Sequence, residues 1–152
     1  MATTLKSAKL TIRVTENITL NGRELGNTNK HEILGINEIS ERILTVPTDQ
    51  ITILSASSGN GAGTFLSSSI KYIRLTNLDD SNFIRLTFTS GSGGSTNTSD
   101  HKLEAKRSMM FTNTAFSGSA TNASFDSFSD FTNLKAKADT ASVDIELFVA
   151  TT

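Results

Sequence analysis

Two histidines, His31 and His101, are the side chains of this sequence best suited to acid–base catalysis or to binding a transition metal. They lie far apart in the chain, each among polar residues, whereas a triad or metal site needs several groups close together. The motifs of a nucleophile elbow, a phosphate-binding loop, a zinc metalloprotease and an EF-hand are absent. Gly59, Gly61 and Gly63 lack the buried strand and helix that flank a dinucleotide site. The sequence therefore predicts a protein that is not an enzyme and holds no cofactor or metal.

Acidic side chains occur in two close pairs, Asp79 with Asp80 and Asp126 with Asp130. Calcium needs more oxygen ligands than either pair supplies, in a different order along the chain. Short polar residues of this kind favour turns, because their side chains bond to nearby backbone groups. We expect both pairs to be turn-forming aspartates.

A short apolar motif, IRLT, occurs twice, at 73–76 and at 84–87, on either side of the polar segment NLDDSN. In each copy the apolar residues alternate with polar ones, as in a strand with one buried face. The polar segment favours a turn between them. The sequence therefore predicts an antiparallel hairpin over residues 71–88, with Ile73 facing Leu86 and Leu75 facing Ile84.

Symmetric pairing about that turn would place Arg74 directly opposite Arg85, which is an unfavourable arrangement of like charges. A slip of one residue would bury an arginine, so the apolar face excludes it. Either the two side chains splay into water, or they meet carboxylates. Those carboxylates would be Asp144 and Glu146 of this chain, or would belong to another chain.

Alternating polarity also predicts strands elsewhere, at 10–20, 31–36, 42–46, 51–54 and 143–149, with a turn at Asn21 and Gly22. Residues 36–41 fit a helical turn as an alternative. Residues 102–111 fit a helix, although a strand with a bulge near Ala105 is preferred. The spacing of Phe125, Phe128 and Phe131 fits one or two turns of helix laid on a sheet.

Gly- and Ser-rich tracts at 55–63 and 90–99 predict loops between these strands. The expected fold is all-β, a single antiparallel β-sandwich of jelly-roll type with long Ser/Gly-rich loops. Its core should combine the apolar faces of three segments, namely Ile73 and Leu75, then Ile84, Leu86 and Phe88, and finally Val143, Ile145, Leu147 and Val149.

Composition narrows the classes of partner. The 152 residues fit one domain, and 14 basic and 15 acidic residues give a net charge of -1 without a basic run, so nucleic acid is not expected. There is no cysteine, and no apolar segment has the length of a signal peptide core or a membrane span. Nine Phe with one Tyr and no Trp favour core packing over sugar binding. We expect a soluble chain with no small-molecule substrate and no membrane partner.

Four stretches, ITLNGRELG at 18–26, ERILTVPT at 41–48, residues 63–88 and LKAKADTASVDIELFVATT at 134–152, resemble small virion structural proteins of tailed bacteriophages. The likeness is to podoviruses of marine and cyanobacterial hosts. LEAKRSMMF at 103–111 departs from the Gly-rich turn found there in many such proteins.

The resemblance implies an all-β capsid decoration, or cement, protein on the outer surface of the virion, assembled in the host cytoplasm. Its partners would be the major capsid protein, copies of itself, or both. A neck, tail or fibre protein is the alternative, and a host-glycan-binding module is a third.

The N-terminal residues 1–9 are polar and lack strand alternation. We expect them to form an arm that docks on another chain, followed by one sandwich domain over residues 10–152. Binding by such a protein would be multivalent, with many modest contacts repeated over the particle. The candidate subunit contacts are Met1, Ala2, Thr3, Thr4, Leu5, Lys6, Arg74 and Arg85.

Overall fold

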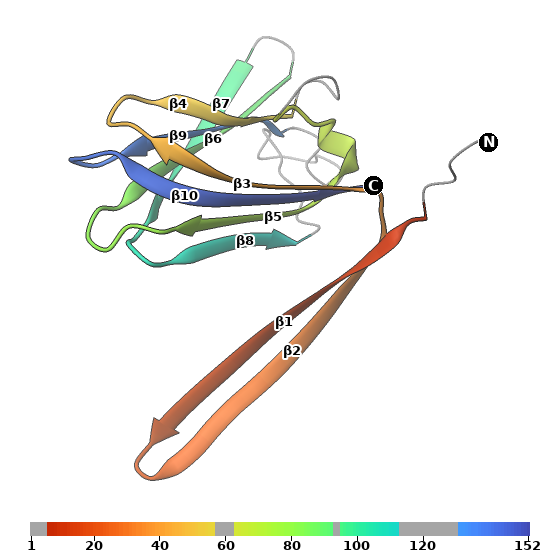
Figure 1. The fold of residues 1–152 in the computed structure, drawn as a ribbon, viewed down its shortest axis with the longest axis vertical. Coiled ribbons are helices and arrows are strands. Elements are labelled where there is room, and N and C mark those ends of the chain that lie inside the picture. The colour runs from red at the N-terminus through yellow and green to blue at the C-terminus, as the bar shows by residue number, and fades with distance from the viewer. Residues whose placement is uncertain (1–5, 57–62, 93–94, 113–130) are drawn as a thin grey trace. The chain divides into compact units, whose positions relative to one another are not determined.

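The computed structural model describes residues 6–56, 63–92, 95–112 and 131–152. The described residues contain no α-helix, and they form three antiparallel sheets, one of two strands and two of four (Figure 1). This confirms the predicted all-β, sandwich-like class. The elements are β1 (Ala8–Leu20), β2 (Arg23–Ile36), β3 (Glu38–Val46), β4 (Ile51–Ser55), the 3-10 helix η1 (Ser67–Ser69), β5 (Ile70–Asn77), β6 (Ile84–Ser92), β7 (Ser95–Leu103), β8 (Ser108–Thr112), β9 (Phe131–Ala138) and β10 (Val143–Thr151).

The chain divides into two compact units. One comprises the described part of residues 1–37 together with Thr152, and the other comprises residues 38–151. The first unit holds the β1–β2 hairpin, and the second holds the remaining eight strands. The expected boundary lay after Lys9. Alternating polarity in residues 10–20 predicts a strand, but it does not tell which sheet that strand joins.

The β1–β2 hairpin turns at Asn21 and Gly22, where the sequence predicts a turn. Both residues have positive φ, 49° and 75°, as the type I′ turn of a two-residue hairpin requires. Residue pairing then runs without interruption from Leu20 with Arg23 to Leu10 with Ile33. The hairpin therefore follows from a local signal.

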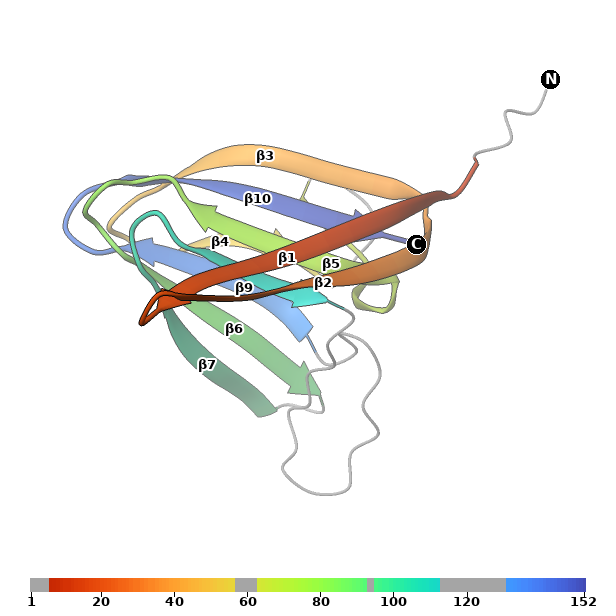
Figure 2. The same ribbon diagram turned by 90° about the horizontal axis from the view of Figure 1, so that it is seen from below.

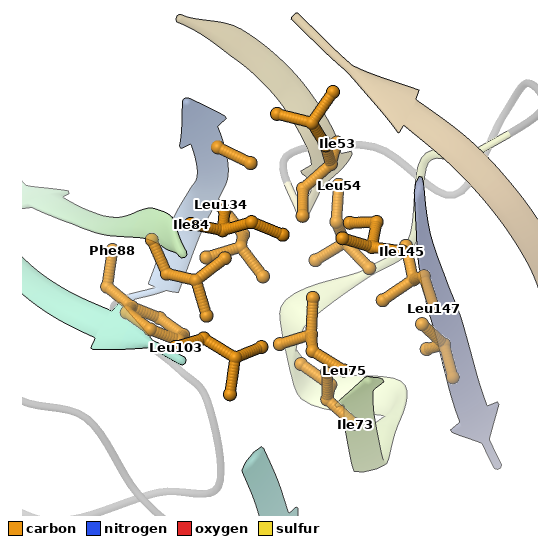
Figure 3. Close-up of a cluster of buried hydrophobic side chains, with 14 of the residues drawn as sticks. Ile53, Leu54, Ile73, Leu75, Ile84, Phe88, Leu103, Leu134, Ile145 and Leu147 are labelled. Atoms are coloured by element: carbon orange, nitrogen blue, oxygen red, sulfur yellow. The ribbon is translucent and has the colours of Figure 1, made fainter. Parts of the chain in front are cut away.

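The second unit is a sandwich of two sheets with strand orders β3-β10-β5-β8 and β4-β9-β6-β7. Figure 2 shows β3 and β10 on one side and β6 and β7 on the other. Apolar side chains from both sheets point toward one another between the layers (Figure 3). The nine residues predicted as the core are all buried in one cluster, which confirms that prediction: Ile73, Leu75, Ile84, Leu86, Phe88, Val143, Ile145, Leu147 and Val149.

The predicted hairpin over residues 71–88 is wrong. β5 pairs with β10 and β8, whereas β6 pairs with β9 and β7, so the two strands belong to different sheets. The segment between them crosses from one layer of the sandwich to the other. The two IRLT copies therefore face each other across the core, which explains why both alternate in the same way. Arg74 and Arg85 consequently lie on opposite outer faces and never oppose each other.

The crossing segment is held by a buried amide and a half-buried carboxylate. Asn77 is fully buried, and its Nδ2 donates to the carbonyl oxygens of Asn82 at 2.9 Å and Leu103 at 3.3 Å. The carboxylate of Asp79 accepts from the backbone N–H groups of Ser81 at 2.8 Å and Asn82 at 2.6 Å. These backbone bonds lower the pKa of Asp79. Asp79 is thus a turn-forming residue, as the sequence predicts.

Further local predictions need correction. Residues 38–41 belong to strand β3 and form no helical turn. Residues 102–111 are neither a helix nor one bulged strand, because β7 ends at Leu103 and β8 begins at Ser108 after a turn in which Lys106 has a φ of 57°. Much of the tract 90–99 is strand rather than loop. Strand β9 was not predicted; Phe131 begins it, while Phe125 and Phe128 lie outside the described residues.

Candidate interaction surface

The groups suited to catalysis or metal binding do not converge. Within the described ranges, no three His, Asp or Glu side chains lie close enough together to hold a metal ion. His31 is exposed on the hairpin. His101 lies in the other unit, with Nε2 3.1 Å from Ser99 Oγ and its ring edge-on to Phe88. Gly59, Gly61, Asp126 and Asp130 lie outside the described residues. The part of the chain that the structure describes contains no apolar helix of membrane-spanning length.

Arg74 is the centre of a charged and aromatic cluster on the outer face of the β3-β10-β5-β8 sheet. Its guanidinium lies 3.1 Å from Glu146 Oε2 and 3.9 Å from Glu41 Oε1. Its Cζ lies 5.7 Å from the centroid of the Phe148 ring, within the range of a cation–π contact. Glu146 is one of the two partners predicted within the chain, and that contact is present. Asp144, the other named carboxylate, instead accepts from Thr45 Oγ1 at 2.6 Å.

Exposed apolar side chains border this cluster. Ile43 is 67% exposed and pairs across the sheet with Glu146, and Met110 is 43% exposed and pairs with Arg74. Protein interfaces are enriched in Arg, Met and aromatic residues, and their centres combine such anchors with apolar contact. We define the Arg74 patch as Glu41, Ile43, Arg74, Met110, Glu146 and Phe148.

Arg85 lies on the outer face of the other sheet, in a row of cations. It pairs directly with Lys137 on one side and Lys102 on the other. Among the described residues its carboxylate neighbour is Asp100 at 3.8 Å, so the prediction that Asp144 or Glu146 would face it is wrong. Lys102 is paired with Glu104 at 2.7 Å. Within the part of the chain that the structure describes, Lys137 makes no ion pair.

The β1–β2 hairpin presents a third surface. Directly paired residues of an antiparallel hairpin share a face, so the register separates an apolar face from a polar one. We define the apolar face as Leu10, Ile12, Val14, Glu16, Ile18 and Leu20 of β1 with Arg23, Leu25, Asn27, Asn29, His31 and Ile33 of β2. Toward the tip this face is open, because Ile18 is 58% and Leu25 is 53% exposed.

The opposite face of the hairpin is polar and internally paired. Thr15 Oγ1 lies 3.2 Å from Thr28 Oγ1 across the strands. Glu32 is held by both Lys30 and Lys9, at 2.5 Å and 3.2 Å, and these contacts lower its pKa. Side chains of the polar face therefore bond to one another within the hairpin, whereas the apolar side chains at the tip of the other face are not covered by the hairpin itself.

The N-terminal candidates are only partly described. Met1, Ala2, Thr3, Thr4 and Leu5 lie outside the described residues, and Lys6 is exposed just before β1.

Sequence reasoning missed Ile43, Met110 and Phe148 of the Arg74 patch. The signal for Ile43 was weak, because β3 carries apolar residues on both of its faces. In the segment from Leu134 to Ala138, the alternation of Lys with Ala and Leu could have revealed β9 and its basic outer face.

Comparison with known proteins gives no relative. No protein-family model, curated protein or solved structure matches this chain.

Proposed function

We propose that this chain is a non-enzymatic structural subunit of a bacteriophage virion, acting as a capsid decoration protein. In this role the sandwich binds the major capsid protein on the outer surface of the shell and stabilises the lattice. The sequence resemblance set out above motivates the virion assignment. The single structural observation that carries the binding role is the Arg74 patch, an exposed sheet face that combines an arginine, an aromatic ring and open apolar side chains.

The chemistry of the patch suits attachment to another protein. Exposed ion pairs such as Arg74 with Glu41 contribute little by themselves, because water screens them and the long side chains lose freedom. Burial of Ile43 and Met110 under a partner would remove apolar surface from water, at about 25 cal/mol per Å². Arg74, already oriented by Glu146 and Phe148, would then lie at the border of a desolvated contact.

A modest contact of this kind is sufficient for a decoration protein. Subunits repeated over a particle hold neighbouring capsomers at several points, so each contact acts at a high effective concentration. A neck, tail or fibre protein could use the same fold, but it would be present in few copies. Copy number, rather than fold, separates these two roles.

The test is binding of the purified protein to virions that lack it. Ile43→Glu and Arg74→Glu should each weaken binding, since one inserts a charge into the apolar part of the patch and the other gathers three carboxylates at its centre. Arg85→Glu is the matched control, because it makes the same charge change on the opposite outer face. Melting temperatures would establish that all variants fold. Equal binding by wild type and both patch variants would refute the role of this face.

A further inference from the structure

We infer that the exposed tip of the hairpin's apolar face is covered by the same face of a second copy of this chain, related to the first by a two-fold axis. This inference is separate from the proposed function, because it concerns contact between copies and not attachment to a capsid. Figure 1 shows β1 and β2 side by side as a long two-stranded ribbon.

Two strands alone cannot bury an apolar face. An isolated hairpin is marginally stable in water, and a third strand or a covering layer is normally needed. In this hairpin, Ile18, Leu20 and Leu25 adjoin one another on one face and are all exposed. Contiguous apolar surface of this kind on a soluble domain usually marks an interaction site. We therefore expect another protein surface to cover this face.

The order of charges along the face identifies that occupant. Ile18 is paired with Leu25, and this apolar row lies between a row holding Glu16 and a row holding Arg23. Glu16 is the only carboxylate of the face and Arg23 is its only arginine. Counted along β1, the Glu16 row lies two residues before the Ile18–Leu25 row, and the Arg23 row, which contains Leu20, lies two residues after it. The two charged rows are therefore equally far from the central row.

A two-fold axis that crosses the strands at the Ile18–Leu25 row makes this pattern self-complementary. The second hairpin then lies antiparallel on the first, about 10 Å away as in packed sheets. Its Arg23 row lies over the Glu16 row of the first copy, and the reverse contact forms by symmetry. A two-fold axis along the strands would instead lay the Glu16–Asn27 row over its own copy and the Leu20–Arg23 row over its own copy, so that like charges share a level. Only the crossing axis brings opposite charges to the same level twice.

The polar face of the hairpin supports this choice of side. Its Thr15–Thr28 and Glu32–Lys30 contacts are already made within one chain. Stacking through that face would remove these groups from water without gaining apolar burial. A face-to-face dimer leaves them solvated on the outside.

The test is sedimentation equilibrium of the full chain with matched variants. Wild type should dimerise, and Ile18→Glu should raise the dimer dissociation constant at least ~100-fold, because two carboxylates would be buried at the axis. Asn17→Glu, on the adjacent residue but the polar face, should change it less than ~3-fold. Circular dichroism melting of each variant would establish that the sandwich remains folded.

Charge reversal tests the orientation. Glu16→Arg and Arg23→Glu should each weaken the homodimer, whereas an equimolar mixture of the two, or the double variant, should restore dimerisation. A monomeric wild type at ~100 µM, or equal loss in Ile18→Glu and Asn17→Glu, would overturn the inference. A monomer that still binds virions, and loses that binding with Ile18→Glu, would also overturn it and would assign the face to the capsid. Dimerisation without virion binding would leave the inference standing and refute the proposed function.

Discussion

Truncation of Leu86 to alanine should be among the most damaging single changes to the sandwich. Leu86 is fully buried on β6, an interior strand that is paired on both sides, with Ala136 of β9 and His101 of β7. Loss of a buried leucine side chain costs about 2–5 kcal/mol, and the cost rises with the size of the cavity that remains. Ladders on both sides hold β6 in place, and Ala136 is too small to fill the space. We therefore expect a cost in the upper half of that range.

Urea unfolding of the full chain would measure this cost. The midpoint should fall while the slope of unfolding free energy against urea stays the same, because the change alters stability and not the surface exposed on unfolding. A domain of this size has roughly 5–15 kcal/mol of stability, so the shift is large. Ile43→Ala is the control, since that side chain is 67% exposed and should change stability by less than ~0.5 kcal/mol. A cost below ~1 kcal/mol for Leu86→Ala would contradict the packing described here.

Three further predictions concern the crossing segment and the hairpin. Asn77→Ala should cost about 1–3 kcal/mol in urea unfolding, because the carbonyl oxygens of Asn82 and Leu103 lose this donor and the second of these bonds is buried; a neutral result would show that Asn77 is dispensable. Gly26→Val should reduce amide exchange protection across the hairpin and weaken dimerisation, since a Cβ at that position lies 2.4 Å from the carbonyl oxygen of Glu16; unchanged protection would contradict this. The lowered pKa of Asp79 stabilises the fold above its ordinary value of 3.8 and loses that effect as pH falls through the lower folded value. The free energy of unfolding of Asp79→Asn should therefore change less with pH in that acidic range than the free energy of unfolding of the wild type. An identical pH profile for the two proteins would argue against the turn contacts.

Local signals in the sequence were sufficient for several elements. Asn21 and Gly22 predict the hairpin turn because few other residue pairs accept two consecutive positive φ angles. The alternation from Val143 to Val149 predicts β10, and the apolar residues of all three central segments are buried together. In these three segments the alternation identified the buried face before the pairing of the strands was known, whereas the same alternation in β1 leaves Ile18 and Leu20 exposed.

Strand pairing around the IRLT repeat could not be predicted in the same way. A hairpin and a crossing between layers both turn the apolar side chains of β5 and β6 toward one core, so their polarity patterns are identical. The segment crosses between the layers because β5 pairs with β10 in one sheet and β6 pairs with β9 in the other. The amide of Asn77 supports that choice through its bond to Leu103, a residue far along the chain. Such long-range pairing leaves no mark on a local pattern.

The Arg74 patch was predicted only in part for a related reason. The contact of Arg74 with Glu146 could be predicted by placing the polar faces of their two strands next to each other in one sheet. Ile43 joins the patch because β3 lies next to β10, and sequence alone gave β3 no preferred outer face. The Arg85 pairing failed because it depended on the incorrect hairpin.

The position and copy number of this chain in purified virions test the proposed decoration role most directly. Density for the intact particle, together with quantitative mass spectrometry, would locate the chain and count it against the major capsid protein. The account predicts a regular array on the outer shell in fixed proportion to the capsid subunits, with the Arg74 patch facing the lattice. Absence from virions, or a few copies confined to the neck, tail or fibres, would contradict it.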